Sequence, residues 1–153
     1  MKPGEQAPDF VLPDQTGTPR RLSELLSDGP VVLFFYPAAM TSGCTAESCH
    51  FRDLAAEFAE VGAQRIGISA DEVDRQRQFD EAHGLGFPLL SDVDRAVAAQ
   101  FGVKRRFLPV PVKRSTFVID TDRTVLEVIS SELNMDVHAD QALERLRQRA
   151  AGT

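Results

Sequence analysis

Several features are scarce in this chain of 153 residues, and each scarcity excludes a class of protein. Only two cysteines occur, which is too few for a disulfide-stapled scaffold. No apolar run approaches the roughly 20 residues that a membrane helix needs. Residues 1–6 also lack the basic-then-apolar pattern of a signal peptide. We therefore expect a cytoplasmic protein that does not bind a membrane.

Positive charge is also in short supply, since 17 Lys+Arg face 23 Asp+Glu and leave a formal net charge of −6. That balance does not favour binding to nucleic acid or to an anionic membrane surface, both of which need clustered Lys and Arg. In contrast, 42% of the residues are hydrophobic, enough for a real core. Because no repeat or Pro/Gly/Ser-rich linker divides the sequence, we expect one domain over residues 1–153.

The hydrophobic pattern predicts alternating strands and helices. Turn residues at 13–19 predict an N-terminal hairpin, and the β-branched and aromatic run 31–36 indicates a central strand buried on both faces. The remaining predicted elements are a helix from Cys44 to Glu60, a strand at 64–70, a helix from Asp71 or Asp74 to His83, a short helix at 93–101, strands at 115–120 and 124–130, and a helix at 138–150. This order predicts an α/β fold with a mixed sheet flanked by helices, and both a thioredoxin-like fold and some small doubly wound folds satisfy it.

Cys44 follows the predicted central strand and lies at or near the first turn of the next helix. Unpaired N–H groups and the positive end of the helix dipole stabilise a thiolate there, so Cys44 is a candidate nucleophile. The hydroxyl of Thr41, three residues earlier, could turn into the same pocket, and Pro37 would screen one side from water. Taken alone, however, a cysteine after a strand is just as well explained as a small buried hydrophobe.

The neighbouring residues favour the nucleophile. The pattern Pro37-x-x-x-Thr41-x-x-Cys44, followed by Cys49 and then Phe51-Arg52-Asp53, closely resembles the active-site segment of peroxiredoxins, and the position of Cys49 is similar to the bacterioferritin comigratory protein (PrxQ) branch. The resemblance covers most of the chain and includes Pro8-Asp9-Phe10, Pro88-Leu89-Leu90-Ser91-Asp92, Phe101-Gly102-Val103 and residues 114–120. It implies a thioredoxin-like fold with an N-terminal β-hairpin, and a peroxidase that uses no metal, haem or flavin.

The resemblance also implies roles for individual residues. Cys44 matches the peroxidatic cysteine, which a peroxide oxidises to a sulfenic acid. Thr41 matches the threonine that orients the peroxide, and Pro37 matches the proline that shields the pocket. Arg114 matches the arginine that stabilises the thiolate and the developing charge on the peroxide oxygens. Glu47 occupies the position of a glutamate that supports this arginine.

Cys49 matches the resolving cysteine, which would form a disulfide with Cys44. On an intact helix, however, five residues separate two Cα atoms by roughly 8–9 Å, whereas a disulfide needs no more than about 6.8 Å. Resolution therefore requires the first helical turn to unwind. Ser42 stands where the family commonly has proline, so we expect a less rigid loop in this chain.

By the same resemblance, the substrates are hydrogen peroxide or organic hydroperoxides, the reductant is a thioredoxin-type dithiol, and the protein is a monomer. Two other hypotheses stay open. Cys49 could be idle, which would make this a one-cysteine peroxidase resolved by an external thiol, or the chain could be a non-catalytic thioredoxin-like redox sensor. A general disulfide oxidoreductase is disfavoured because Cys-x-x-Cys is absent.

The histidines and the basic cluster carry weaker signals. His50 follows Cys49, but Cys-x4-Cys-His lacks the usual paired spacing of zinc ligands, and His83 and His138 lie in unrelated polar segments, so no metal site is predicted. Lys104-Arg105-Arg106 is expected to be a solvated loop, with a positive rim around the thiolate as the alternative. The phenylalanines at 34, 35, 51, 58 and 117 are expected in the core.

Overall fold

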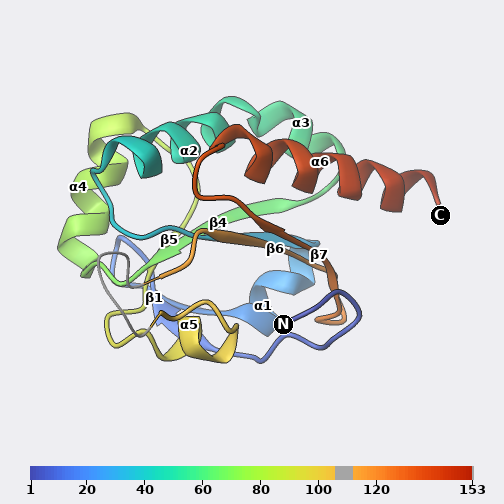
Figure 1. Ribbon diagram of the computed structural model, residues 1–153, viewed down its shortest axis with the longest axis horizontal. Coiled ribbons are helices and arrows are strands. Elements are labelled where there is room, and N and C mark those ends of the chain that lie inside the picture. Colours follow the sequence, from blue (N-terminus) through green and yellow to red (C-terminus); the bar gives the residue numbers. More distant parts are fainter. Residues whose placement is uncertain (106–111, 153) are drawn as a thin grey trace.

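The computed structural model of the protein describes residues 1–105 and 112–152 (Figure 1). Its larger sheet has five strands in the order β5-β4-β3-β6-β7. The strands are β3 (Val31–Phe35), β4 (Gln64–Ser69), β5 (Leu89–Ser91), β6 (Ser115–Ile119) and β7 (Val125–Ser130). Strands β3, β4 and β5 run parallel, whereas β6 pairs antiparallel with both β3 and β7. The predicted mixed sheet with residues 31–36 at its centre is therefore confirmed.

The N-terminal hairpin is also confirmed, as β1 (Val11–Pro13) paired antiparallel with β2 (Pro19–Arg21). Asp14 closes its turn, because Oδ1 accepts from the backbone N–H groups of Thr16 and Thr18. A short helix α1 (Leu22–Leu25) and a 3₁₀ turn η1 (Leu26–Asp28) follow, and neither was predicted. These elements are too short to give a helical period, although Leu22, Leu25 and Leu26 are all buried.

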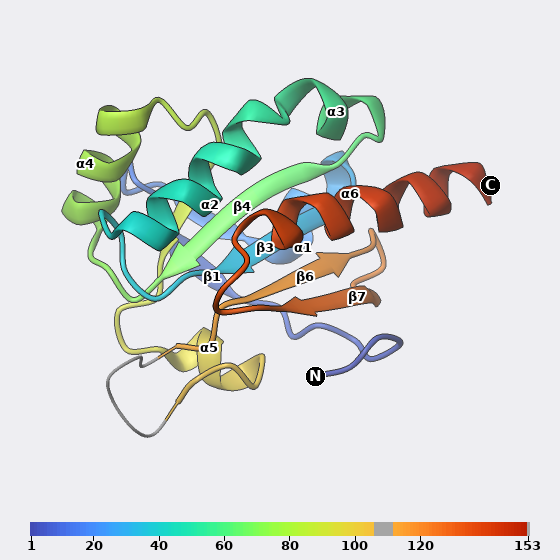
Figure 2. The same ribbon diagram turned by 45° about the horizontal axis from the view of Figure 1, so that its top comes forward.

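The central strand β3 separates two hydrophobic cores, because its side chains alternate between the sheet faces. Val31, Leu33 and Phe35 pack with α1 and with α5 (Ala96–Gln100). Val32 and Phe34 pack on the other face, beneath α2 (Ser42–Asp53), α3 (Ala55–Glu60), α4 (Val73–His83) and α6 (Asp136–Ala151). On that face α2 and α6 lie side by side (Figure 2).

The single helix expected from Cys44 to Glu60 is wrong: α2 begins at Ser42, and the helix breaks at Leu54, where φ is −95° and ψ is 20°. Arg65 on β4 explains why the break is tolerated, since its Nη1 donates to the carbonyl of Phe51 at 2.9 Å. A carbonyl that loses its helical partner is thereby satisfied. The break leaves Phe51 and Phe58 both fully buried.

The C-terminal part of α2 is fixed to the sheet by aromatic stacking. The rings of Phe34 and Phe51 are parallel within 8°, with centroids 4.2 Å apart. Gly67 on β4 makes room for this layer, because a Cβ there would lie 3.0 Å from atoms of both Phe34 and Tyr36. The five phenylalanines expected in the core are all buried.

Two further boundaries differ from expectation. Neither Asp71 nor Asp74 caps α4, which starts at Val73 without a side-chain cap. The helix ends at His83 as predicted, followed by Gly84 in the left-handed conformation (φ 55°). The helix expected at 93–101 is shortened to α5, because Asp92 accepts the N–H groups of Val97 and Ala98. In the described ranges, no helix has the length and hydropathy required to cross a membrane.

Candidate active site

The loop between β3 and α2 delivers Cys44 to a helix N-terminus, as predicted. Thr41 is extended at the N-cap position, with φ −82° and ψ 156°, and Ser42 is the first residue of α2. The N–H of Thr45 donates to the Thr41 carbonyl at 2.9 Å, which closes the first turn. Cys44 lies inside this turn, and its side chain has no exposed surface.

A hydrogen-bond network that extends from partly buried Asp71 to buried Gln76 holds this loop in position. Asp71 Oδ2 accepts from the backbone N–H of Ala39 at 2.7 Å and from Ser69 Oγ at 2.6 Å. Ser69 Oγ in turn accepts from Gln76 Nε2 at 2.8 Å, and the Tyr36 hydroxyl donates to Gln76 Oε1. The loop is therefore tied to β4 and α4, a role for Asp71 that sequence reasoning missed.

Arg114 connects Cys44 with Glu47. It precedes β6, and its Nη2 donates to Cys44 Sγ at 3.3 Å, while Nη1 donates to Glu47 Oε1 at 2.7 Å. A Cβ at Gly43 would lie 3.3 Å from the same Nη2, so glycine at this position leaves room for the guanidinium. The structure thus brings together Cys44, Glu47 and Arg114, three of the residues that the sequence pointed to.

Burial and nearby charges change the pKa values of Glu47 and Arg114. Glu47 has no exposed surface, and Arg114 is only 6% exposed. Burial raises the pKa of Glu47 from its usual 4.5 to about 7, opposed by the positive charge of Arg114. The pKa of Arg114 is itself raised, because the attraction of Glu47 and Cys44 outweighs burial, which lowers it. The guanidinium remains charged and directs that charge at the sulfur.

His138 lies in the same cluster, contrary to the expectation that it belongs to an unrelated polar segment. It is fully buried near the start of α6, with Nδ1 2.8 Å from Thr116 Oγ1 and 3.6 Å from Glu47 Oε2. No local pattern indicates this contact, because His138 and Glu47 stand 91 positions apart on different helices.

Thr41 and Pro37 flank Cys44 rather than contact it through a hydrogen bond. Thr41 is exposed, and its hydroxyl donates to the Ala38 carbonyl at 2.8 Å. With its hydrogen so engaged, Oγ1 keeps lone pairs that can accept a hydrogen bond from a peroxide. Pro37 is partly buried one position after Tyr36.

Cys49 lies on the same unbroken helix as Cys44, and both thiols are free. Cys44 is fully buried, whereas Cys49 is partly exposed. The structure therefore corresponds to the reduced protein with α2 folded, the state in which helical geometry keeps the two sulfurs apart.

Arg105 of the basic cluster is linked to Arg114 through Glu132. Glu132, after β7, accepts from the backbone N–H of Arg114 at 3.0 Å and from Arg105 Nη2 at 2.9 Å. Lys104 forms an isolated β-bridge with Val112. Arg106 falls outside the described residues, so the prediction of a solvated loop stays untested there.

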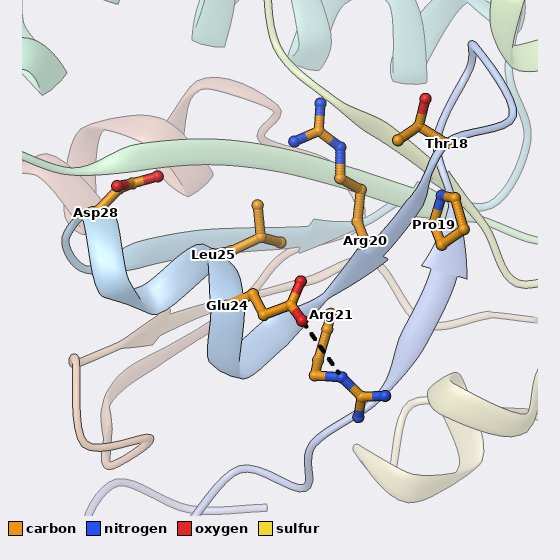
Figure 3. A pocket seen from close by; sticks show the side chains of 7 residues that line it. All are labelled: Thr18, Pro19, Arg20, Arg21, Glu24, Leu25 and Asp28. Atoms are coloured by element: carbon orange, nitrogen blue, oxygen red, sulfur yellow. Dashed lines mark ion pairs between the residues drawn. The ribbon is translucent and has the colours of Figure 1, made fainter.

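A surface pocket of about 150 Å³ lies beside the hairpin and α1 (Figure 3). It is lined by Arg20, Arg21 and Glu24 among others, with Arg21 Nε 3.9 Å from Glu24 Oε1. Leu25 of this pocket belongs to the core on the face opposite Cys44. The pocket is therefore separate from the cysteine site.

Comparison with known proteins agrees with this geometry. Residues 3–128 match the AhpC/TSA family. The chain is 36% identical to the chloroplastic peroxiredoxin Q of Sedum lineare over 144 residues, which cover 94% of this chain and 77% of that protein. The crystal structure of peroxidoxin BcpB from Mycobacterium tuberculosis shares 69% identity over 97% of each chain, with a TM-score of 0.93. The bacterioferritin comigratory protein of Xanthomonas campestris shares 30% identity over 92% of each chain, with a TM-score of 0.84.

These likenesses confirm the thioredoxin-like fold that the resemblance implied and leave the doubly wound alternatives without support. They extend well beyond the segment around Cys44. The chain therefore belongs to the AhpC/TSA family, in its peroxiredoxin Q (bacterioferritin comigratory protein) branch.

Proposed function

We propose that the protein is a thiol-dependent peroxidase that reduces hydrogen peroxide and organic hydroperoxides. The thiolate of Cys44 attacks one peroxide oxygen, so that an S–O bond forms while the O–O bond breaks. The other oxygen leaves and takes up a proton as water or alcohol, and the sulfur becomes a sulfenic acid. The observation that carries this proposal is the 3.3 Å contact between Arg114 Nη2 and Cys44 Sγ at a helix N-terminus.

The other site residues serve this step. Arg114 stabilises both the thiolate and the charge that develops on the peroxide oxygens. Glu47 holds the guanidinium through its 2.7 Å bond to Nη1. Thr41 Oγ1 accepts the peroxide hydrogen and orients the O–O bond, while Pro37 limits access of water. The alkyl peroxide reduction named for the Xanthomonas relative supports the inclusion of organic hydroperoxides.

Cys49 completes the cycle. Its thiolate attacks the sulfenic sulfur, an S–S bond forms and water leaves, which requires the first turn of α2 to unwind. A thioredoxin-type dithiol then reduces the disulfide by exchange. We assign the reaction to the cytoplasm, where dithiol reductants keep such thiols reduced, and to a monomer whose catalytic unit is one domain over residues 1–153.

The test is a rapid-quench reaction of the reduced protein with one equivalent of hydrogen peroxide, read by intact mass and by the peptide containing both cysteines. The expected result is loss of two hydrogens within the first turnover, mapped to a Cys44–Cys49 bond. Unchanged protein on this timescale would reject catalysis and favour the redox-inert alternative.

A Cys49→Ser variant separates the two-cysteine and one-cysteine mechanisms. Oxidation of Cys44 should stay fast in this variant, because Cys49 takes no part in the first step, and one added oxygen should remain on Cys44. Turnover with thioredoxin should collapse. If turnover instead persists at the rate of the unmodified chain, Cys49 is idle and an external thiol resolves the sulfenic acid.

A further inference from the structure

The buried imidazole of His138 has a defined tautomer. Its Nε2 lies 2.8 Å from the carbonyl oxygen of Ser131. Because a carbonyl only accepts, Nε2 carries a hydrogen. The second nitrogen, Nδ1, lies 2.8 Å from Thr116 Oγ1, whose hydroxyl can donate to it. In the neutral imidazole Nδ1 is therefore an acceptor with no hydrogen of its own.

Glu47 presents an unsatisfied oxygen to this nitrogen. Its Oε1 accepts from Arg114, whereas Oε2 is buried without a hydrogen-bond partner and lies 3.6 Å from His138 Nδ1. An ionised Glu47 would place a buried anionic oxygen 3.6 Å from Nδ1, an acceptor that has no hydrogen to offer it, and both groups are fully buried. A buried acceptor that faces another acceptor is costly. A proton on Glu47 Oε2, which faces Nδ1 across the 3.6 Å gap, removes this conflict.

Other charges face the pair from every side of the cluster. Arg114, before β6, favours the ionised form of Glu47, while Glu132, after β7, opposes it. Arg114 also disfavours protonation of His138, and Cys44 lies on the far side of the guanidinium. Burial raises the pKa of Glu47 to about 7 and lowers the pKa of His138. These directions agree with a proton held near neutral pH on the Glu47 side of the gap.

We propose that His138 is a positioning residue that holds one proton jointly with Glu47 and thereby sets how much of the Arg114 charge acts on the Cys44 thiolate. When the pair holds the proton, Glu47 is neutral and the guanidinium charge is left to the sulfur. When the proton is lost, the Glu47 carboxylate competes with the sulfur for that charge. Loss of the proton from Glu47 and ionisation of the Cys44 thiol are therefore coupled. The catalytic consequence rests on the proposed peroxidase function, but the shared proton does not.

The first test reads the proton directly in the unmodified chain. Nitrogen-15 NMR of the three histidines, with His138 assigned from a His138→Phe variant, should show Nε2 protonated across the pH range. The Nδ1 signal should shift as the pH passes through about 7, the value for Glu47, and Glu47→Gln should abolish that shift. A His138 protonated on Nδ1 instead, or a signal that does not move with pH, would overturn the proposal.

The second test measures coupling through the thiolate. In a Cys49→Ser background Cys44 is the sole thiol, and its far-ultraviolet thiolate absorbance can be titrated. Glu47→Gln should move the midpoint to lower pH by about one unit, since Arg114 is no longer shared. His138→Phe should move it to higher pH, because Glu47 then loses its proton more readily.

The double variant Glu47→Gln/His138→Phe shows whether His138 acts by positioning or only by packing. With Gln at position 47 there is no proton to share, so His138→Phe should leave the midpoint unchanged. If His138 only fills space, the same shift should appear with either residue at position 47, and the proposal is rejected. Neither test uses a peroxide. Failure of peroxidase turnover therefore leaves the shared proton standing, and failure of the shared proton leaves the peroxidase standing.

Discussion

Arg114 and Cys44 are 70 residues apart in the sequence, yet Arg114 Nη2 donates to Cys44 Sγ at 3.3 Å. The pairing of β3 with β6 brings them together. Strands β3 and β6 are antiparallel, with Phe35 opposite Ser115. The end of β3, which leads to α2, therefore lies beside the start of β6, which follows Arg114. The contact between cation and sulfur is a product of strand register.

Replacing Arg114 with Lys should slow peroxide reduction by about 10²-fold, the effect of losing one well-placed donor to a developing charge. A lysine keeps the charge but has no planar fork to bond Cys44 and Glu47 together. The measurement is the second-order rate of Cys44 oxidation under stopped flow. Arg105→Lys is the matched control, because Arg105 pairs with Glu132 at the surface, and its rate should stay within about twofold.

Replacing Thr41 with Val should lower the same rate by about 10²-fold, since valine has the shape of threonine without the oxygen that accepts the peroxide hydrogen. Thr41→Ser keeps that oxygen and should retain most of the rate. The helix content should be unchanged in both variants, because the Thr41 side chain makes no cap hydrogen bond to α2. Equal rates for Val and Ser would remove Thr41 from the mechanism.

Replacing Ser42 with Pro should stabilise the reduced protein by about 0.4–1 kcal/mol and slow disulfide formation. Ser42 is the first residue of α2, where proline is well tolerated, and Thr41 already has the extended conformation that a following proline requires. The gain comes from the restricted unfolded chain. Urea unfolding and rapid-quench disulfide formation measure the two effects. Ser42→Ala, which does not restrict φ in this way, should leave disulfide formation close to that of the unmodified chain.

Glu47 should make stability depend on pH in a direction unusual for a carboxyl. Its pKa rises from 4.5 to about 7 on folding, because burial disfavours the charged form. The folded protein therefore holds this proton more tightly, and the resulting stability is complete below about pH 4.5 and lost as the pH rises through about 7.

Relative to Glu47→Gln, the unmodified chain should accordingly lose at most about 3 kcal/mol of unfolding free energy over this pH range. Urea unfolding of both chains at matched pH values measures the difference. The lowered pKa of His138 acts in the opposite direction and reduces the net pH dependence of each chain. If the difference in unfolding free energy between the two chains stayed constant across this pH range, the raised pKa of Glu47 would be contradicted.

Local patterns in the sequence predicted much of this molecule. The apolar run 31–36 indicated a central strand, and β3 lies at the centre of the sheet. The position of Cys44 after that strand indicated a helix N-terminus, which α2 provides. These predictions succeed because burial on both faces and the start of a helix are properties of a few consecutive residues. The break at Leu54 was not predictable, since it depends on Arg65 from another strand.

The chemistry available to the protein is encoded in a short stretch of sequence: one cysteine at a helix N-terminus, a second five residues later, and the motif that matches peroxiredoxins. Which groups are buried together with Cys44 depends on the packing of distant elements. Strand register placed Arg114 there, and the packing of α6 against α2 added His138 to Glu47. The cost of removing a charge from water depends on every element that surrounds it, so the protonation of this cluster cannot be read from any single segment.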